Sequence, residues 1–206
     1  MPKVVDHPAY RKQLLALCFD LFAQRGYSAL TMRQIAEALE ISTGALYHYF
    51  PTKEALFQQL VEEVTQQTVF EAIAQIQQHS DPEARLTALF DFLAQHEEQL
   101  RKQLLVILDY YQHRDLYGSA AGKILRAGAD RYCQALQNYL HLPDQKLVVL
   151  LKTQINGLLV QRMLRASTTP FVEQARPFVT MFVAFLRTTE AERSMLSETR
   201  AQSAER

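Results

Sequence analysis

The sequence contains little glycine, proline or cysteine. Only 6 glycines and 7 prolines occur in 206 residues, while 48% of the residues are hydrophobic, so the composition is that of a globular protein and not of a disordered chain. No stretch shows the alternation of β-branched residues that indicates strands, and alanine, leucine and glutamine are frequent throughout. The sequence therefore predicts an all-α fold, long enough to bury a core.

Two further features are missing, a cysteine pattern and an export or membrane segment. Cys18 and Cys133 have neither the spacing of metal ligands nor that of a disulfide framework. The N-terminus has no basic segment followed by an apolar run and a cleavage site, and no stretch approaches the roughly 20 apolar residues that span a bilayer. We therefore expect a cytoplasmic protein with reduced thiols in its core, and we expect no metal or cofactor.

The formal net charge is zero, because 22 basic residues balance 22 acidic ones. The charges are unevenly distributed, however. Residues 1–53 contain six basic and four acidic residues, a net charge of +2, which leaves −2 for the remainder. This asymmetry is small, and its sign favours phosphate contact at the N-terminal end.

Helix signals divide the first 78 residues into four helices. An apolar stripe predicts a helix over about 8–25 that stops at Gly26, and Thr31 with Gln34 forms a capping-box pattern for the next. Ser42 or Thr43 caps a short third helix that ends near Phe50, before Pro51. Thr52 caps a long helix over about 53–78. Two short helices joined by the link 40–43 and supported by a third are what a helix-turn-helix unit requires.

The rest of the chain is predicted to be a helical body. Breaks rich in proline, glycine, serine or threonine separate five further stretches, over about 83–96, 98–113, 118–141, 145–166 and 171–190. The segment 191–206 is polar and rich in small residues, so we expect it to be frayed or disordered. The predicted organisation is a DNA-binding domain at 1–55, a ligand-binding and dimerisation domain at 56–190, and a tail at 191–206.

The segment from Phe22-Ala-Gln-Arg-Gly-Tyr through Thr31-Met-Arg-Gln-Ile-Ala to Gly44-Ala-Leu-Tyr-His-Tyr-Phe-Pro-Thr-Lys-Glu-Ala-Leu-Phe57 closely resembles the tetracycline-repressor (TetR) family. The resemblance is specific over about residues 10–60 and only architectural beyond them. It implies a three-helix DNA-binding head, a divergent helical ligand-binding body, and dimerisation through the last two helices. It also implies a repressor more often than an activator, although no residue decides the sign of regulation.

The third helix and its neighbours supply the candidate DNA contacts. Gly44 and Ala45 have almost no side chain, which allows close approach to a phosphate or a thymine methyl. Tyr47 and His48 are expected to point outward and to donate hydrogen bonds to phosphates or base edges, unless they form a surface patch or partner contact. Tyr49 is expected to turn its ring toward the core with its hydroxyl at phosphate level, and Thr43 completes the set within this helix.

Three candidates lie outside the third helix. Lys53, in the first turn of the long helix, is disfavoured by the helix dipole unless an anion neutralises it, so we expect it to clamp a phosphate; the alternative is a solvated lysine. Thr31 either meets a phosphate or serves only as an N-cap. Arg33 is a candidate for phosphate or minor-groove contact, or a solvated arginine.

The last two helices are the candidate dimer interface. The helix around 147–164 is apolar over much of its circumference and contains Gly157, which costs about 1 kcal/mol relative to alanine unless it permits close helix approach. One such helix pair per subunit would form a four-helix bundle with its symmetry mate. The predicted interface residues are Leu158, Met181, Phe182 and Phe185; the alternative is that these faces form intramolecular core.

A polar and aromatic cluster at 109–114 interrupts the apolar body and is the candidate site for a small-molecule effector of unknown identity. The predicted lining residues are Tyr110, Tyr111, His113, Tyr132 and Asn156, in a cavity between the long helix and the segment 110–113. The competing interpretation is that these residues lie on the surface.

An enzyme is disfavoured, because His48, His96 and His113 lack partners at metal-ligand spacing and no nucleophile elbow or phosphate-binding glycine loop occurs. We expect a sequence-specific, ligand-released repressor that binds a palindromic operator in double-stranded DNA as a homodimer. The alternative is a helical dimeric interaction protein, or an activator without small-molecule induction.

Overall fold

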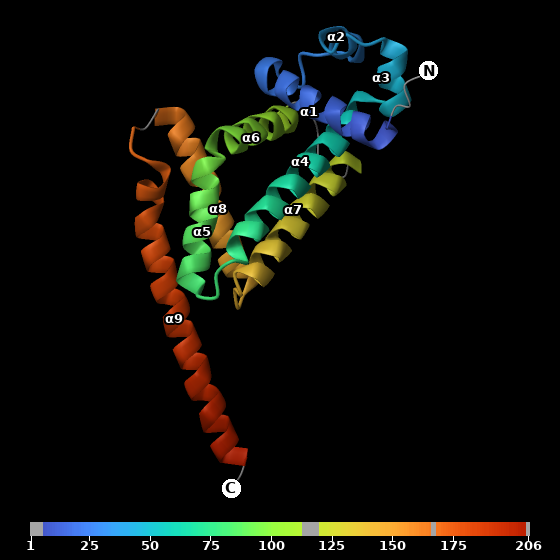
Figure 1. The fold of residues 1–206 in the computed structure, drawn as a ribbon. Helices are drawn as coiled ribbons and strands as arrows, with labels where there is room; N and C mark the ends of the chain where they lie inside the picture. Colours follow the sequence, from blue (N-terminus) through green and yellow to red (C-terminus); the bar gives the residue numbers. More distant parts are fainter. Residues whose placement is uncertain (1–5, 113–119, 166–167, 205–206) are drawn as a thin grey trace.

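The computed structural model describes residues 6–112, 120–165 and 168–204, and these ranges are entirely helical apart from turns (Figure 1). The secondary structure is therefore the all-α one predicted. The helices are α1 (His7–Arg25), α2 (Met32–Ala38), α3 (Thr43–Tyr49), α4 (Lys53–Ile76), α5 (Pro82–Gln95), α6 (Glu97–Gln112), α7 (Ala120–Tyr139), α8 (Gln145–Arg165) and α9 (Phe171–Ala204).

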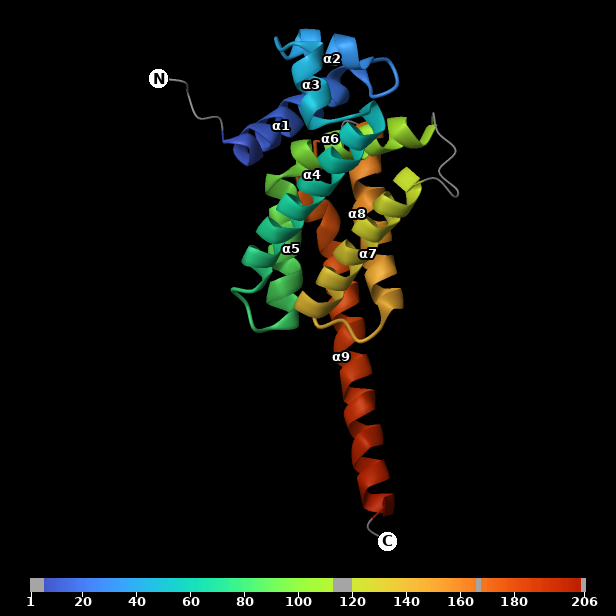
Figure 2. The ribbon, with the colours of Figure 1, turned by 90° about the vertical axis from the view of Figure 1, so that its right-hand side faces the viewer.

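A head formed by α1, α2 and α3 lies at one end of a helical body (Figures 1 and 2). Helix α4 starts in the head and runs down the body, where it packs against α5 and α7. Helix α6 crosses beneath the head and contacts both α1 and α8. Helix α9 packs on α5 and then continues past the end of the body away from the head. Helices α4 and α6 thus both join the head to the body.

The caps read from the sequence start the head helices. The Thr31 hydroxyl accepts a hydrogen bond from the Gln34 N–H, and the Gln34 side chain accepts one from the Thr31 N–H, which completes the capping box. Ser42 caps α3 and Thr52 caps α4, each by accepting the N–H three residues on. These caps confirm the predicted helix starts and fix the helix-turn-helix geometry.

Two hydrophobic cores hold the molecule together. The body core lies among α4, α5, α7, α8 and α9 and includes Phe90 and Phe182. The head core combines α1, α2, α3 and the first turns of α4, and it also takes in Val106 and Tyr110 from α6. Since α6 belongs to the body by sequence, the head core is completed by residues from outside the head.

The C-terminal end differs from the prediction. Helix α9 continues to Ala204, whereas the sequence was expected to fray from Ala191. The continuation has a physical reason, because alanine, glutamate and arginine, which all favour helix over coil, make up nine of the sixteen residues at 191–206. Its polar composition was read as disorder, but the same residues are good helix formers.

Candidate DNA interface

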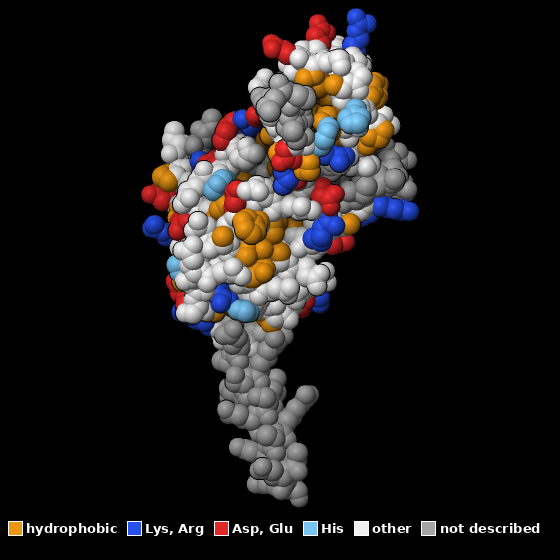
Figure 3. Space-filling view, turned by 45° about the vertical axis from the view of Figure 1, so that its right-hand side comes forward, with side chains coloured by type: hydrophobic (Ala, Val, Ile, Leu, Met, Phe, Trp, Pro, Cys, Tyr) orange, Lys and Arg blue, Asp and Glu red, His pale blue; other side chains and the backbone are white. Residues whose placement is uncertain are grey.

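Helix α3 presents the side chains expected to read DNA. Leu46 is fully buried in the head core, and this fixes the roll of the helix so that Tyr47 and His48 are exposed, Tyr47 by 48%. Histidine and apolar side chains gather on one face of the head in the space-filling view (Figure 3). The exposed positions therefore lie on a helix whose opposite side is anchored, as a reading helix requires.

The start of α3 is open to close approach. Gly44 is exposed, and a Cβ placed there would have the Ser42 hydroxyl oxygen, at 4.0 Å, as its nearest neighbour. Ala45 and Thr43 are half-buried in the first turn. A flat surface could thus come near the backbone of this turn, in keeping with the role predicted for these small residues.

Tyr49 ties α3 to α1. Its hydroxyl is hydrogen-bonded to His7 Nδ1 at 2.9 Å, and its backbone carbonyl accepts a bond from Arg11 Nη2 at 3.2 Å. The Arg11 guanidinium also lies over the ring of Phe50, 5.5 Å from its centroid. Helix α1 therefore holds the last turn of α3. Sequence reasoning missed Arg11 and His7, because nothing in local spacing indicates a contact across about 40 residues.

Lys53 is the clearest departure from the predicted set. Its ammonium donates to the carbonyls of Tyr27, at 2.8 Å, and Leu30, at 2.6 Å, and it sits 4.1 Å from the centroid of the Tyr27 ring. The prediction of a phosphate clamp is wrong for this conformation, because the side chain turns inward and fastens α4 to the α1–α2 turn. Two carbonyl dipoles and an aromatic face supply the negative potential that we had assigned to DNA.

Thr31 and Arg33 are the two candidates at the start of α2, and Thr31 is already hydrogen-bonded within the protein. Both the N–H and the hydroxyl of Thr31 donate to Gln34 Oε1, at 2.9 and 2.8 Å. The N-cap interpretation therefore describes Thr31. Arg33, two residues further on, is exposed, so its charge remains a candidate for a phosphate contact.

The predicted effector-site residues do not come together. Tyr110 is 1% exposed in the head core, so its assignment to a ligand cavity is wrong, whereas Tyr132 packs against the body core. Tyr111 and Asn156 are exposed, and His113 lies outside the described residues. Burial, with the neighbouring Cys133, raises the pKa of Tyr132 to about 12, which keeps this phenol neutral.

The hollows found in the described residues lie elsewhere. Two open grooves, of about 640 and 480 Å³, lie between α1, α3 and α4 and along α4 and α5, and neither is lined by Tyr110, Tyr111, Tyr132 or Asn156. A small apolar cavity between α1, α4 and α6 has about 10 Å³, the space of a single water. This hollow between α4 and α6 is thus too small for an effector.

The predicted dimer residues fall on two different faces. Leu158 and Phe182 are 4% and 1% exposed and belong to the body core, so their assignment to the interface is wrong. Met181 and Phe185 are 60% and 52% exposed on the outer face of α9. Phe182 and Phe185 are three residues apart, about 60° around the helix, so the boundary between the buried and the exposed side of α9 runs between them, and sequence alone gives no absolute roll.

The outer face of α8 is apolar as well. Val149, Leu150 and Leu164 are exposed there, and Gly157 is exposed in mid-helix with nothing within 4 Å of an added Cβ. By length and composition the stretch Gln145–Leu164 could cross a membrane, contrary to our expectation, and 28% of it is buried. Helices α8 and α9 therefore each expose several large apolar side chains, as interaction surfaces often do.

The described residues contain no cluster of three or more histidine, cysteine, aspartate or glutamate side chains that could hold a metal ion. Both cysteines are free, and burial raises the pKa of the Cys18 thiol to about 12.

Comparison with known proteins agrees with this geometry. Residues 14–60, from the middle of α1 into α4, match the model of the bacterial regulatory proteins of the tetR family. The N-terminal segment belongs to the TetR family. It is 35% identical over 113 residues to the transcriptional repressor KstR2 of Mycolicibacterium smegmatis, a match that covers 52% of this chain and 53% of KstR2. The chain thus spans about half the length of this curated relative.

The likeness in fold extends over most of the chain. A FadR regulator from Bacillus subtilis, solved in complex with stearoyl-CoA, aligns with a TM-score of 0.68 at 14% identity over 84% of this chain and 97% of FadR. A regulator from Saccharomonospora viridis, solved in complex with choline, aligns with a TM-score of 0.69 at 18% identity over 86% of this chain and 97% of its own. At these identities the likeness concerns the fold alone, because few residues are the same in the aligned proteins.

Proposed function

We propose that this protein is a transcriptional regulator that binds a palindromic DNA operator as a homodimer and is released from it by a small molecule. The observation that carries the proposal is the anchored α3 with Tyr47 and His48 exposed. A buried Leu46 below and the Arg11 and His7 contacts at the far end hold this helix in one orientation. Rigid presentation of a few polar side chains is what groove reading needs.

A homodimer is supported by the surface of α8 and α9. One short reading helix contacts only a few base pairs, so useful specificity requires two heads. The exposed apolar residues of the two helices, among them Leu164, Met181 and Phe185, would be covered when each pair packs on its symmetry mate in a four-helix bundle. The exposed Gly157 would allow the two copies of α8 to cross closely.

Release by an effector is supported by the fold relatives. The stearoyl-CoA and choline complexes belong to proteins that share this body architecture. In our proposal an effector enters between the body helices, beside Tyr132, and displaces the side chains that fill that space. Since α4 runs from the head into the body core, its displacement would move the head.

The proposal is tested by selecting bound sequences from random DNA duplexes with the full-length protein. We expect an enriched palindrome, two subunits per duplex by sedimentation, and affinity that falls steeply with salt as phosphate contacts are screened. The variant with Tyr47→Ala and His48→Ala should lose the enrichment, while the control Tyr111→Ala should keep it. Binding without any sequence preference would refute the proposal.

A further inference from the structure

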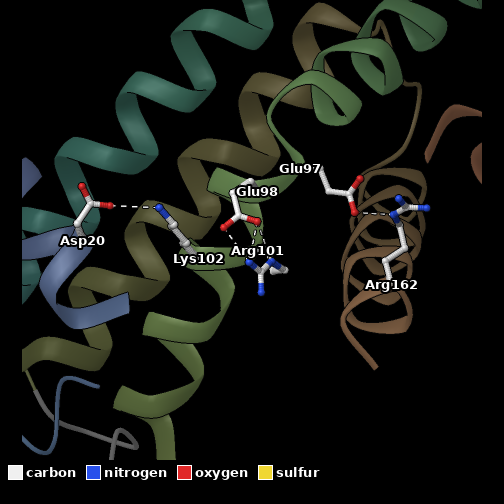
Figure 4. A network of polar contacts seen from close by, with 6 residues as sticks. All are labelled: Asp20, Glu97, Glu98, Arg101, Lys102 and Arg162. Carbon is white, nitrogen blue, oxygen red and sulfur yellow. Dashed lines mark hydrogen bonds and ion pairs between the residues drawn. The ribbon is translucent and has the colours of Figure 1, made fainter. Parts of the chain in front are cut away.

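Helix α6 connects the helix that we place at the dimer interface with the head. At its N-terminal end Glu97 pairs with Arg162 of α8, Nε to Oε1 at 2.5 Å (Figure 4). The Arg162 side chain is only 13% exposed and also donates to the Thr169 carbonyl at 2.6 Å. This end of α6 is therefore fastened to α8 and, through Arg162, to the chain just before α9.

The opposite end of α6 is fastened to the turn between α1 and α2. The Asp109 carboxylate accepts hydrogen bonds from the Ser28 N–H at 3.0 Å and from the Ser28 hydroxyl at 3.2 Å. The turn is shaped to receive it. Gly26 has a φ of +80°, where a larger residue would strain the backbone, and a Cβ built there would touch the Asp109 carboxylate at 3.4 Å.

Two further contacts accompany the carboxylate. The next residue, Tyr110, enters the head core, and Lys102, two turns earlier, pairs with Asp20 of α1 at 3.4 Å (Figure 4). The Lys102 pair is exposed and contributes little. Asp109 differs, because it accepts a bond from a backbone N–H of the turn that leads directly into α2 and so into the recognition unit.

The head is thus attached to the body at two points, through α4 and through the end of α6. Helix α4 alone could bend along its length and so let the head tilt relative to the body, whereas a second attachment to one side of it restricts that movement. We propose that Asp109, through Ser28, is a specificity-determining residue that fixes the spacing between the two operator half-sites. The proposal rests on the dimeric regulator proposed above.

The link from α8 to the head determines where each α3 points relative to the dimer axis. Two recognition helices must meet major grooves about 34 Å apart, and one inserted base pair changes this by about 3.4 Å and about 35° of rotation. A head that is held at two points is strained when it meets the altered spacing, and this weakens binding. A head that can tilt meets the altered spacing with little strain. Loss of the Asp109 contact should therefore relax the spacing requirement before it abolishes binding.

The experiment compares the selected operator with derivatives that carry one base pair more or one fewer at the centre. The quantity measured is the ratio of dissociation constants, altered over original spacing, for the full-length protein. We expect Asp109→Ala to lower this ratio at least about fivefold, with the original operator bound less than about tenfold more weakly. Ser28→Ala should act in the same direction, and the double variant should match Asp109→Ala. Asp130→Ala, at an exposed position on α7, is the control.

An unchanged or larger ratio in Asp109→Ala overturns the proposal. If that variant fails to fold, Asp109→Asn and Ser28→Ala give the same comparison with less disturbance. If the wild type selects no operator, the regulator proposal has failed, and amide hydrogen exchange of the DNA-free protein still tests the link. Exchange at residues 26–31 should then be faster in Asp109→Ala than in Asp130→Ala, and equal rates would overturn the inference.

Discussion

The ring of Tyr110 stacks on the ring of Phe57, with centroids 3.9 Å apart and planes 7° from parallel. Tyr27 meets both rings edge-on, at 4.9 and 4.8 Å. One aromatic cluster thus joins Tyr110 of α6, Phe57 of α4 and Tyr27 of the α1–α2 turn. Residues of α4 and α6 complete the core of the head, so a movement of either helix changes the position of the head.

Replacement of Tyr110 tests that dependence. Tyr110→Ala should lower the free energy of unfolding by about 3–5 kcal/mol, because it leaves a cavity between two stacked or edge-on rings. Urea denaturation followed by circular dichroism measures the change. Tyr111→Ala is the matched control, since its neighbouring ring is 46% exposed and its loss should cost no more than about 0.5 kcal/mol. Equal effects of the two substitutions would contradict the assignment of Tyr110 to the core.

Substitution of Lys53 distinguishes a structural role of its ammonium from a phosphate contact. If its ammonium fastens α4 to the carbonyls of Tyr27 and Leu30, then Lys53→Met should lower the free energy of unfolding by about 1–3 kcal/mol. The slope of operator affinity against salt should stay as in the wild type, because no phosphate contact is lost. Lys146→Met, at an exposed position, controls for the change of charge. A salt slope that falls by about one unit, with unchanged stability, would restore the phosphate clamp.

The two faces of α9 should respond differently to a buried charge. Phe185→Asp lies on the outer face and should give a folded monomer, whereas Phe182→Asp lies in the body core and should prevent folding of the subunit. Sedimentation equilibrium, together with circular dichroism, distinguishes a folded monomer from an unfolded chain. A Phe185→Asp protein that remains dimeric at micromolar concentration would exclude this face of α9 from the interface.

The buried Cys18 thiol should make stability fall at high pH. Its pKa is about 12 in the folded chain against an ordinary value of 9.0, so above pH 9 the unfolded chain loses a proton that the folded chain keeps. The free energy of unfolding should therefore decline between about pH 9 and 12, and Cys18→Ala should decline less steeply than the wild type. Identical slopes for both proteins would show that the thiol does not contribute.

The sequence was a good guide where structure is set locally. Caps act over three residues, and Thr31, Ser42 and Thr52 start their helices as predicted. Pro51 likewise ends α3 where the restriction on its preceding residue requires it. The apolar face of α2, and the outward direction of Tyr47 and His48, follow from helical periodicity once Leu46 is taken as buried.

The sequence was a poor guide where a residue's role depends on distant neighbours. Tyr110 looked like a binding residue because it belongs to a polar and aromatic cluster in an apolar body, and Lys53 because it is a cation in the first turn of a helix. Only the fold shows that Tyr27 meets both. Periodicity shows that α8 and α9 have apolar faces, but it cannot say which face meets the subunit's own core. Leu158 and Phe182 were therefore placed on the wrong side.

The central claim is that α3 is the helix that reads DNA. The decisive measurement is a titration of the selected operator with wild type and with Tyr47→Ala, at several salt concentrations and with the thermal midpoint of each protein determined alongside. We predict that Tyr47→Ala binds at least about tenfold more weakly, with an unchanged thermal midpoint, because the side chain is exposed and supports no core contact. Equal operator affinity of the two proteins at every salt concentration would contradict the assignment of α3 to DNA.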